Sequence, residues 1–450
     1  MQKSMKNLSP LRKVKDRFFF LCQYTFIVLA VHIGFVTPFC HANLLTNEAA
    51  GLYEKSRPGV FQIRVINLAT KEKSATGSGF YISPEGHIVT NYHVVSEYIM
   101  KPDRYRVEHI GSDDTSRNLK LVHFDIVHDL AILLSDEKPQ YYLPLGHSQI
   151  DKGMNIFSMG NPHDLGMTII EGTFNGLMEN SRYRKILFSA SLNSGMSGGP
   201  ALNHSGEVIG INVSTMGNDV SFLVPVEFLK DLYTQVQANG AIASVDYKNL
   251  IERQLLDNQD AFITNLISTD WEHLNTNGLL IPSEITPSVK CWGDSYDEEN
   301  ALMVKVKTSC RSSDHIFMSN NMNTGYYEHW FSHHKSKGLN TFRLYNHIEN
   351  DLKFASSFAD SFFFDNENKE DLTKFQCHTD FVKVAGQTWK TSLCVRQYKD
   401  FKQLFDMELI LSTVTKFDEE FMGGLVAMGV NQPRGKDLTE KFLGEIRWQD

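Results

Sequence analysis

The chain has 450 residues, of which 42% are hydrophobic and 22% are charged, and its formal net charge is −9. This composition is that of an ordinary globular protein and excludes a fibrous or largely disordered chain. A net negative charge supplies no overall positive field for a phosphate backbone, which excludes nucleic acid as the main partner. At about 100 to 200 residues per domain, we expect two or three domains.

The first 42 residues predict an export signal. Basic residues are frequent up to Arg17, and the stretch Phe18–Phe39 contains no charged residue. Small residues at the positions that a signal peptidase inspects favour cleavage after Ala42. The alternative is an uncleaved anchor in the inner membrane through residues 18–39. In both cases we expect the rest of the chain to be exported, either periplasmic or secreted, because the basic flank stays inside.

Short apolar segments follow between residues 59 and 226. They are rich in Val, Ile, Phe and Tyr and are separated by Gly, Pro and Asn, a pattern typical of an all-β barrel or sandwich. The predicted strands are Val60–Ile66, Gly79–Ile82, His87–Asn91, Leu119–Asp125, Leu130–Leu134, Asn155–Met159, Ile186–Ser189, Val208–Val213 and Ser221–Val224. Apolar residues at helical spacing predict a helix over Pro225–Gln237.

The second half of the chain has a different pattern. Residues 241–290 predict a helical or irregular connector, and residues 291–450 return to strand-like runs before a final amphipathic helix over Lys436–Ile446. Downstream of the leader four cysteines remain, and their close spacing favours local disulfides that join Cys291 to Cys310 and Cys377 to Cys394. Other pairings stay open from the sequence alone, and a zinc site is disfavoured because no Cys-x-x-Cys pair is present.

The strongest chemical signal is the glycine-rich segment Asn193–Pro200, which carries Ser197. A serine that attacks a carbonyl carbon must lie at the tip of a tight turn, with free backbone N–H groups that face the developing oxyanion. We expect the N–H groups of Gly195 and Ser197 to supply that oxyanion hole.

A serine nucleophile also needs a base and an acid that orients the base. His93 follows a predicted strand, and Asp129 precedes another one, so the order His, Asp, Ser predicts a catalytic triad. Asp125 is the alternative acid, but the strand that begins at Leu130 favours Asp129. His123 and His128 are expected to be solvated loop residues.

Six segments that occur in this order resemble the HtrA/Deg family of trypsin-like serine proteases. They are Gly77–Phe80, Gly86–Val95, Asp129–Leu133, Met159–Pro162, Asn193–Pro200 and Gly206–Asn212. The resemblance implies two perpendicular six-stranded barrels of the chymotrypsin type over residues 43–240, with the active site between them. It also implies a substrate-binding site made by Ser191, Asn212, Val213 and Ser214. Since Ser191 is neutral, we expect cleavage after small or medium apolar residues.

After residue 240 no PDZ pattern is recognisable, although relatives in this family usually carry one. We expect residues 291–450 to form a second, disulfide-bearing, β-rich α+β domain of unknown function. His329 and His333 have a spacing that could bind metal on a helix, but their aromatic, strand-like surroundings favour a structural role. The sequence therefore predicts a serine endopeptidase of exported or envelope proteins that uses no cofactor or metal. The alternative is a catalytically inactive, protease-like binding or chaperone protein of the cell envelope.

Overall fold

The computed structural model describes residues 42–111, 115–217, 219–297, 301–346, 349–350, 370–414 and 418–449. The predicted leader, apart from Ala42, lies outside these residues, and so does the predicted membrane segment 18–39. Within the described part of the chain, no helix has the length and apolar character needed to cross a membrane. The described chain starts with helix α1 (Ala42–Ser56), followed by the short 3-10 helix Arg57–Gly59.

The first closed barrel has the strand order β1-β2-β3-β6-β5-β4, and every pairing is antiparallel. Its strands are β1 (Val60–Asn67), β2 (Lys73–Tyr81), β3 (His87–Thr90), β4 (Tyr105–Ile110), β5 (Ser116–Asp125) and β6 (Leu130–Ser135). Helix α2 (Tyr92–Met100) follows β3 and packs on this barrel with Tyr92, Val94, Val95 and Ile99 buried. His93 therefore lies in the first turn of a helix, three residues after the end of strand β3, although we expected it at the end of that strand.

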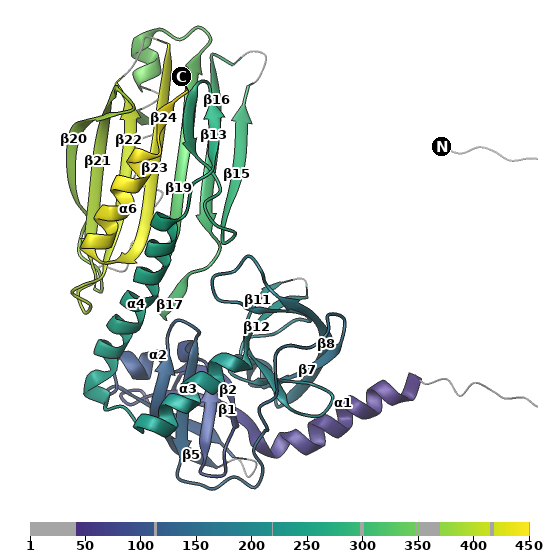
Figure 1. Ribbon diagram of the computed structural model, residues 1–450. Coiled ribbons are helices and arrows are strands. Elements are labelled where there is room, and N and C mark those ends of the chain that lie inside the picture. Colours follow the sequence, from purple (N-terminus) through teal and green to yellow (C-terminus); the bar gives the residue numbers. More distant parts are fainter. Residues whose placement is uncertain are drawn as a thin grey trace, which may run out of the picture. The chain divides into compact units, whose positions relative to one another are not determined.

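The second closed barrel has the order β10-β11-β12-β9-β8-β7. Its strands are β7 (Asn155–Gly160), β8 (Thr168–Leu177), β9 (Ile186–Ser189), β10 (Pro200–Leu202), β11 (Val208–Gly217) and β12 (Val220–Pro225), with a 3-10 turn at Pro162–Asp164. Helix α3 (Val226–Asn239) follows, close to the predicted bounds, and buries Leu229, Leu232 and Val236 as its spacing predicts. The two barrels confirm the predicted chymotrypsin-like fold (Figure 1).

Helix α4 (Tyr247–Ser268) packs against two hydrophobic cores. Its first half, with Leu250, Ile251 and Leu255, joins the core of the first barrel, whereas Phe262, Ile263 and Leu266 join a second core formed by the C-terminal sheet (Figure 1). A 3-10 turn at Ser244–Asp246 precedes the helix. The segment predicted as a connector thus contains a long helix and also the hairpin β13 (His273–Thr276) and β14 (Leu279–Pro282), which pairs with β24 (Arg447–Trp448).

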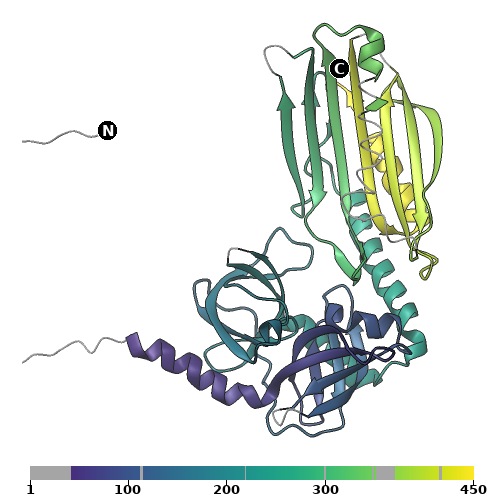
Figure 2. The ribbon, with the colours of Figure 1, turned by 180° about the vertical axis from the view of Figure 1, so that it is seen from behind.

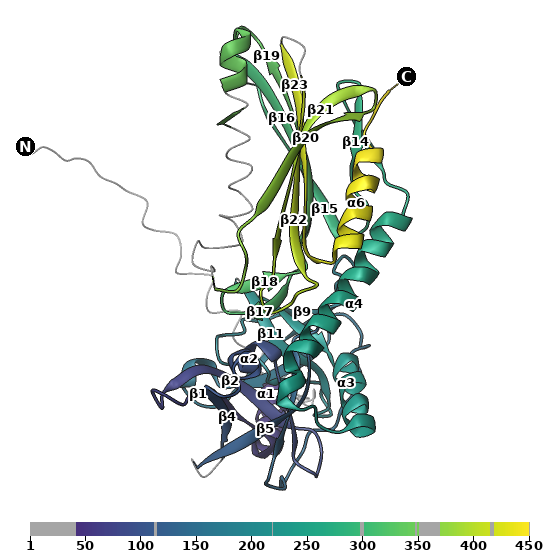
Figure 3. The same ribbon diagram turned by 90° about the vertical axis from the view of Figure 1, so that its left-hand side faces the viewer.

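The C-terminal part is built on a seven-stranded antiparallel sheet with the order β15-β16-β19-β23-β22-β21-β20. These strands are β15 (Val289–Tyr296), β16 (Met303–Ser312), β19 (Tyr327–Ser336), β20 (Gln376–Val384), β21 (Gln387–Gln397), β22 (Phe405–Thr413) and β23 (Glu419–Val430). Helix α6 (Gln432–Gly444) lies beside α4 on one face of the sheet and buries Leu438 and Phe442 (Figures 1 and 3). Figure 2 shows the sheet from behind. A second, β-rich α+β part after the barrels confirms the predicted fold class.

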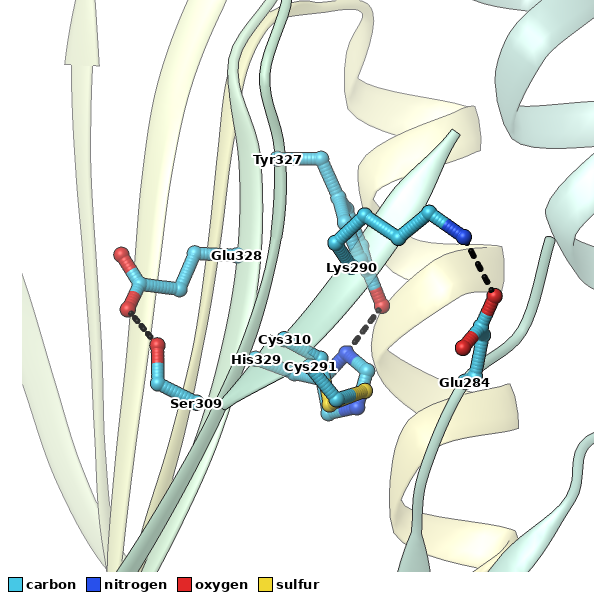
Figure 4. The surroundings of a disulfide bond; sticks show 8 residues. All are labelled: Glu284, Lys290, Cys291, Ser309, Cys310, Tyr327, Glu328 and His329. Atoms are coloured by element: carbon cyan, nitrogen blue, oxygen red, sulfur yellow. Dashed lines mark hydrogen bonds and ion pairs between the residues drawn. A yellow bond between two sulfur atoms is a disulfide. The ribbon is translucent and has the colours of Figure 1, made fainter. Parts of the chain in front are cut away.

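Both predicted disulfides are present, and each joins an outer strand of the sheet to its neighbour. Cys291 on β15 pairs directly with Cys310 on β16, and Cys377 on β20 pairs with Cys394 on β21. Figure 4 shows the first bond next to His329, whose Nδ1 is hydrogen-bonded to the Tyr327 hydroxyl at 3.2 Å.

A small two-stranded hairpin, β17 (Ile316–Ser319) and β18 (Met322–Thr324), lies between β16 and β19 in the sequence. It does not join the large sheet. Ile316, Met318 and Met322 are instead buried in the core that contains the first barrel and the first half of α4. The C-terminal part is therefore packed directly on the barrel that carries His93.

Candidate active site

Asp129 holds His93 at two points. Its Oδ1 accepts the backbone N–H of His93 at 2.8 Å, and its Oδ2 lies 2.7 Å from His93 Nδ1. Asp129 lies in the turn between β5 and β6 with a positive φ of 58°, and its carbonyl accepts a hydrogen bond from the Asn91 side chain at 2.8 Å. The turn and the first residues of α2 are thus locked together, and this fixes the orientation of the imidazole.

The environment of His93 sets its protonation. Burial lowers the pKa of His93, but the charge of Asp129 and the hydrogen bond to it outweigh burial, so that the pKa is raised above its usual value. The side chains of His93 and Asp129 are 28% and 18% exposed. With Nδ1–H donated to the carboxylate, Nε2 is the nitrogen that is free to accept a proton.

Ser197 lies in the turn between β9 and β10, beside the segment that carries His93. Glycines make this approach possible. A Cβ on Gly198 would lie 2.3 Å from Ser78 O and 2.4 Å from Thr90 Oγ1, and Gly198 has a φ of 84°. A Cβ on Gly77 would lie 2.6 Å from Val94, the neighbour of His93, and 3.0 Å from Ser197 O. The structure therefore brings the predicted nucleophile next to the predicted base.

The backbone of the serine turn leaves two of its N–H groups without a partner among the described residues. The carbonyl of Ser194 accepts the N–H of His163 at 2.8 Å, and since a trans peptide is planar, the Gly195 N–H points the opposite way. The N–H groups of Met196 and Gly198 donate to backbone carbonyls at 3.0 and 2.9 Å. Within the described residues, neither the Gly195 N–H nor the Ser197 N–H has an acceptor. These two donors are therefore available to a substrate oxygen.

The hydroxyl of Ser197 does not point at His93 in this structure. It donates to the carbonyl of Val213 at 3.0 Å, and no hydrogen bond links it to His93 among the described atoms. Catalytic hydrogen bonds are often long or misaligned before substrate binds.

The four predicted substrate-binding residues have different environments. Ser191 donates its hydroxyl to Asp219 Oδ1 at 2.6 Å, a partner that the sequence analysis missed. Asn212 is fully buried, and its amide donates to the carbonyls of Met159 and Met196 at 2.9 and 3.2 Å, so that its side chain supports the serine turn from behind. The carbonyl of Val213 accepts a hydrogen bond from the Ser197 hydroxyl. The backbone of Ser214 pairs with Phe222 on β12.

The expectation of solvated loop histidines is wrong for His123, whereas His128 lies in the turn between β5 and β6 as expected but is only partly exposed. His123 is 7% exposed on β5. His128 Nδ1 lies 2.6 Å from Asp125 Oδ2, and its ring stacks on Phe228 of α3 with centroids 3.8 Å apart. The alternative acid Asp125 is therefore engaged by His128, and His93 is engaged by Asp129.

His329 and His333 lie on strand β19, where residues four apart on one face are about 13 Å apart, too far to bind one metal ion. Burial lowers the pKa of His329 to about 4. Among the residues that the structure describes, no cluster of three or more His, Cys, Asp or Glu side chains could hold a metal ion.

One further group near His93 comes from the hairpin β17–β18. The ring of Phe317 meets the imidazole edge to face, with centroids 5.9 Å apart and an interplanar angle of 72°. The residues are 224 positions apart, and Phe317 lies in an apolar run that reads as an ordinary core strand. No local signal in the sequence could have placed it at this site.

Comparison with known proteins agrees with this geometry. Residues 77–211 match the family described as a trypsin-like peptidase domain. The chain is 30% identical over 274 residues to protease Do-like 1 of Arabidopsis thaliana chloroplasts, a match that covers 52% of this chain and 60% of the relative. It is 34% identical over 180 residues to a probable periplasmic serine endoprotease DegP-like of Rhizobium meliloti, covering 38% of this chain and 34% of the relative.

Serine protease HTRA2 of Bos taurus mitochondria is 32% identical over 200 residues, 41% of this chain and 42% of the relative. The chain thus spans less than two thirds of the length of each of these relatives. Among solved structures, Deg5 matches 44% of this chain and 98% of its own, with 28% identity and a TM-score of 0.39.

The double barrel and the matched region define a trypsin-like peptidase domain. This domain is similar to those of HtrA/Deg-like serine proteases.

Proposed function

We propose that the protein is a serine endopeptidase that uses His93, Asp129 and Ser197 as its triad. The observation that carries this proposal is the bidentate hold of Asp129 on His93 next to a serine turn with two unpaired N–H groups. Acyl transfer requires a nucleophile, an oriented base and an oxyanion hole, and the arrangement of Ser197, His93 and Asp129 supports this assignment.

In the proposed reaction, His93 Nε2 takes the proton of Ser197 as Oγ attacks the scissile carbonyl carbon. The N–H groups of Gly195 and Ser197 stabilise the negative oxygen of the tetrahedral intermediate. His93 then gives the proton to the leaving amine, the C–N bond breaks, and an acyl-enzyme remains. Water, deprotonated by His93, attacks the ester, and release of the acid restores the Ser197 hydroxyl.

The proposed substrates are proteins or peptides in an exported compartment. Disulfides persist in oxidising compartments, the leader predicts export, and several relatives are named periplasmic. At the residue before the scissile bond we propose a small or medium apolar side chain, since Ser191 is neutral. The carboxylate of Asp219, 2.6 Å from Ser191 Oγ, repels an acidic side chain there and attracts a cationic one, so cleavage confined to bonds after Lys or Arg would contradict the apolar preference.

A fluorophosphonate probe tests the proposal directly. The probe should label the purified wild-type protein at Ser197 and should fail to label Ser197→Ala and His93→Ala. Ser205→Ala is the matched control, because Ser205 lies in the exposed turn after β10. Absence of labelling in a folded wild-type protein would favour the inactive, protease-like binding protein instead.

A further inference from the structure

The hairpin β17–β18 is fixed against the helix that carries His93. The Tyr92 hydroxyl donates to the carbonyl of Met318 at 3.1 Å, and both side chains are fully buried. Tyr92 directly precedes His93, so the bond couples the hairpin to the first turn of α2. Successive side chains of a strand point to opposite faces. Ile316 and Met318 are buried within the core, whereas Phe317 is partly buried at the margin of the same core, where its ring meets the imidazole.

Two sets of contacts hold both ends of the hairpin. On the sheet side, the buried hydroxyl of Tyr398 lies 2.9 Å from Thr324 Oγ1 and donates to Asp406 at 2.7 Å, and Asp406 pairs with Arg396 at 2.9 Å. A buried, fully bonded network of this kind is rigid. Thr324 at the end of β18 is thereby tied to strands β21 and β22.

On the barrel side, Asp314 accepts hydrogen bonds from Ser181 Oγ, from the Arg182 N–H at 2.8 Å and from Lys185 Nζ at 3.2 Å. The guanidinium of Arg182 donates to the carbonyl of Gly325 at 2.7 Å. Residues 181–185 belong to the loop between β8 and β9 of the second barrel. The hairpin is therefore attached to both barrels, and Phe317 is held in one position relative to His93.

The path of an extended substrate follows from the site. The carbonyl of Val213 on β11 lies 3.0 Å from Ser197 Oγ, so a peptide whose carbonyl carbon is within reach of Oγ passes beside this part of β11. Side chains of an extended peptide alternate between two faces. If the residue before the scissile bond enters the pocket at Ser191, and if His93 lies on the other side of the peptide, the residue before that faces the imidazole and Phe317.

We propose that Phe317 is a specificity-determining residue, which limits the second residue before the scissile bond to small side chains. This inference rests on the proposed endopeptidase function. The C-terminal part would then complete the substrate site, because the ring of Phe317 occupies space beside the imidazole that the barrels leave open to a larger side chain.

A peptide library that varies only the second residue before the bond tests this inference. For the wild-type protein, kcat/KM should be highest with Gly, Ala or Ser at that position. In Phe317→Ala, kcat/KM for peptides with Leu or Phe at that position should rise about tenfold relative to the Ala peptide. This is the scale of the change when a hydrophobic pocket is enlarged. The fluorophosphonate probe has no residue at that position, so it should label Phe317→Ala at the wild-type rate.

Matched variants keep the result interpretable. Phe317→Leu retains an apolar side chain on the core and should give a smaller gain in kcat/KM for the same peptides. This variant therefore tests the inference even if Phe317→Ala does not fold. Phe381→Ala, which removes a phenylalanine 62% exposed on outer strand β20, should leave the profile unchanged. If both Phe317 variants fold and are labelled by the probe but keep the wild-type preference for the second residue, this inference is overturned while the proposed function stands. A wild-type protein that is not labelled would overturn the proposed function, and this inference with it.

Discussion

His128 Nδ1 lies 2.6 Å from Asp125 Oδ2. His93 makes the same kind of contact with Asp129, which follows Asp125 by four residues. Burial raises the pKa of Asp125, but its hydrogen bonds and the charge of His128 outweigh burial and lower the pKa below its usual value. The Asp125–His128 pair is stacked against α3, whereas the His93–Asp129 pair lies beside Ser197. The two pairs therefore provide a matched test of which carboxylate serves the reaction.

Asp129→Asn should lower kcat on the order of 10⁴-fold, because the amide cannot hold the imidazole in the tautomer that leaves Nε2 free. The measurement is the steady-state rate with a peptide substrate. Asp125→Asn is the control and should keep the wild-type rate. A loss of activity in Asp125→Asn with activity retained in Asp129→Asn would reverse the assignment.

Activity should rise with pH through the titration of His93. The protonated imidazole cannot accept the serine proton, and the pKa of His93 is raised above 6.5, so the acid limb of kcat/KM should lie above pH 6.5. In Asp129→Ala the attraction is lost while burial remains, and the limb should move to lower pH. A limb that stays in place in this variant would show that Asp129 does not set the pKa.

Removal of the Cys291–Cys310 bond should destabilise the C-terminal sheet by about 3 kcal/mol, the loop-closure entropy expected for its sequence separation of 19. The double variant Cys291→Ala, Cys310→Ala avoids placing a new polar group at the buried Cys310 site. All five tryptophans lie between residues 271 and 448, so their fluorescence in urea reports on this part of the chain. An unchanged midpoint would contradict the prediction.

Asp314→Asn should weaken the attachment of the β8–β9 loop by about 1.5 to 3 kcal/mol, the value of hydrogen bonds to a charged group. The side chain of Asp314 is 5% exposed and pairs with Lys185. Trypsin should then cleave faster after the exposed Arg184. Asp297→Asn, at an exposed ion pair with Lys337, is the control and should not change the rate. Equal cleavage in both variants would indicate that Asp314 does not secure the loop.

Much of the barrel architecture could be predicted because its pattern is local. The strand predicted over Leu130–Leu134 is β6 (Leu130–Ser135), and the one predicted over Val60–Ile66 is β1 (Val60–Asn67). Runs of β-branched residues bounded by turn residues define such strands without reference to the rest of the fold. The disulfides were predictable for the same reason, since cysteines 19 and 17 positions apart lie on adjacent strands of a hairpin or meander.

Contacts between distant segments could not be predicted. Phe317 reaches His93 because the hairpin leaves the large sheet and packs on the first barrel, which depends on the tertiary fold of both parts. Asp219 meets Ser191 through the turn between β11 and β12, although neither residue carries a motif. The stacking of His128 on Phe228 could not be predicted, because Phe228 lies on a helix 100 residues away in the sequence.

The two disulfides have a consequence for how the sheet meets other proteins. Outer strands expose unpaired backbone groups and invite addition of a foreign strand or exchange between copies. Here β15 and β20 are both such strands, and nearly every residue of β20 is exposed. Each is bonded covalently to its neighbour, so neither can detach and recruit another chain unless a thiol first opens the bond. Protection of these two strands against exchange between copies is therefore tied to an oxidising environment.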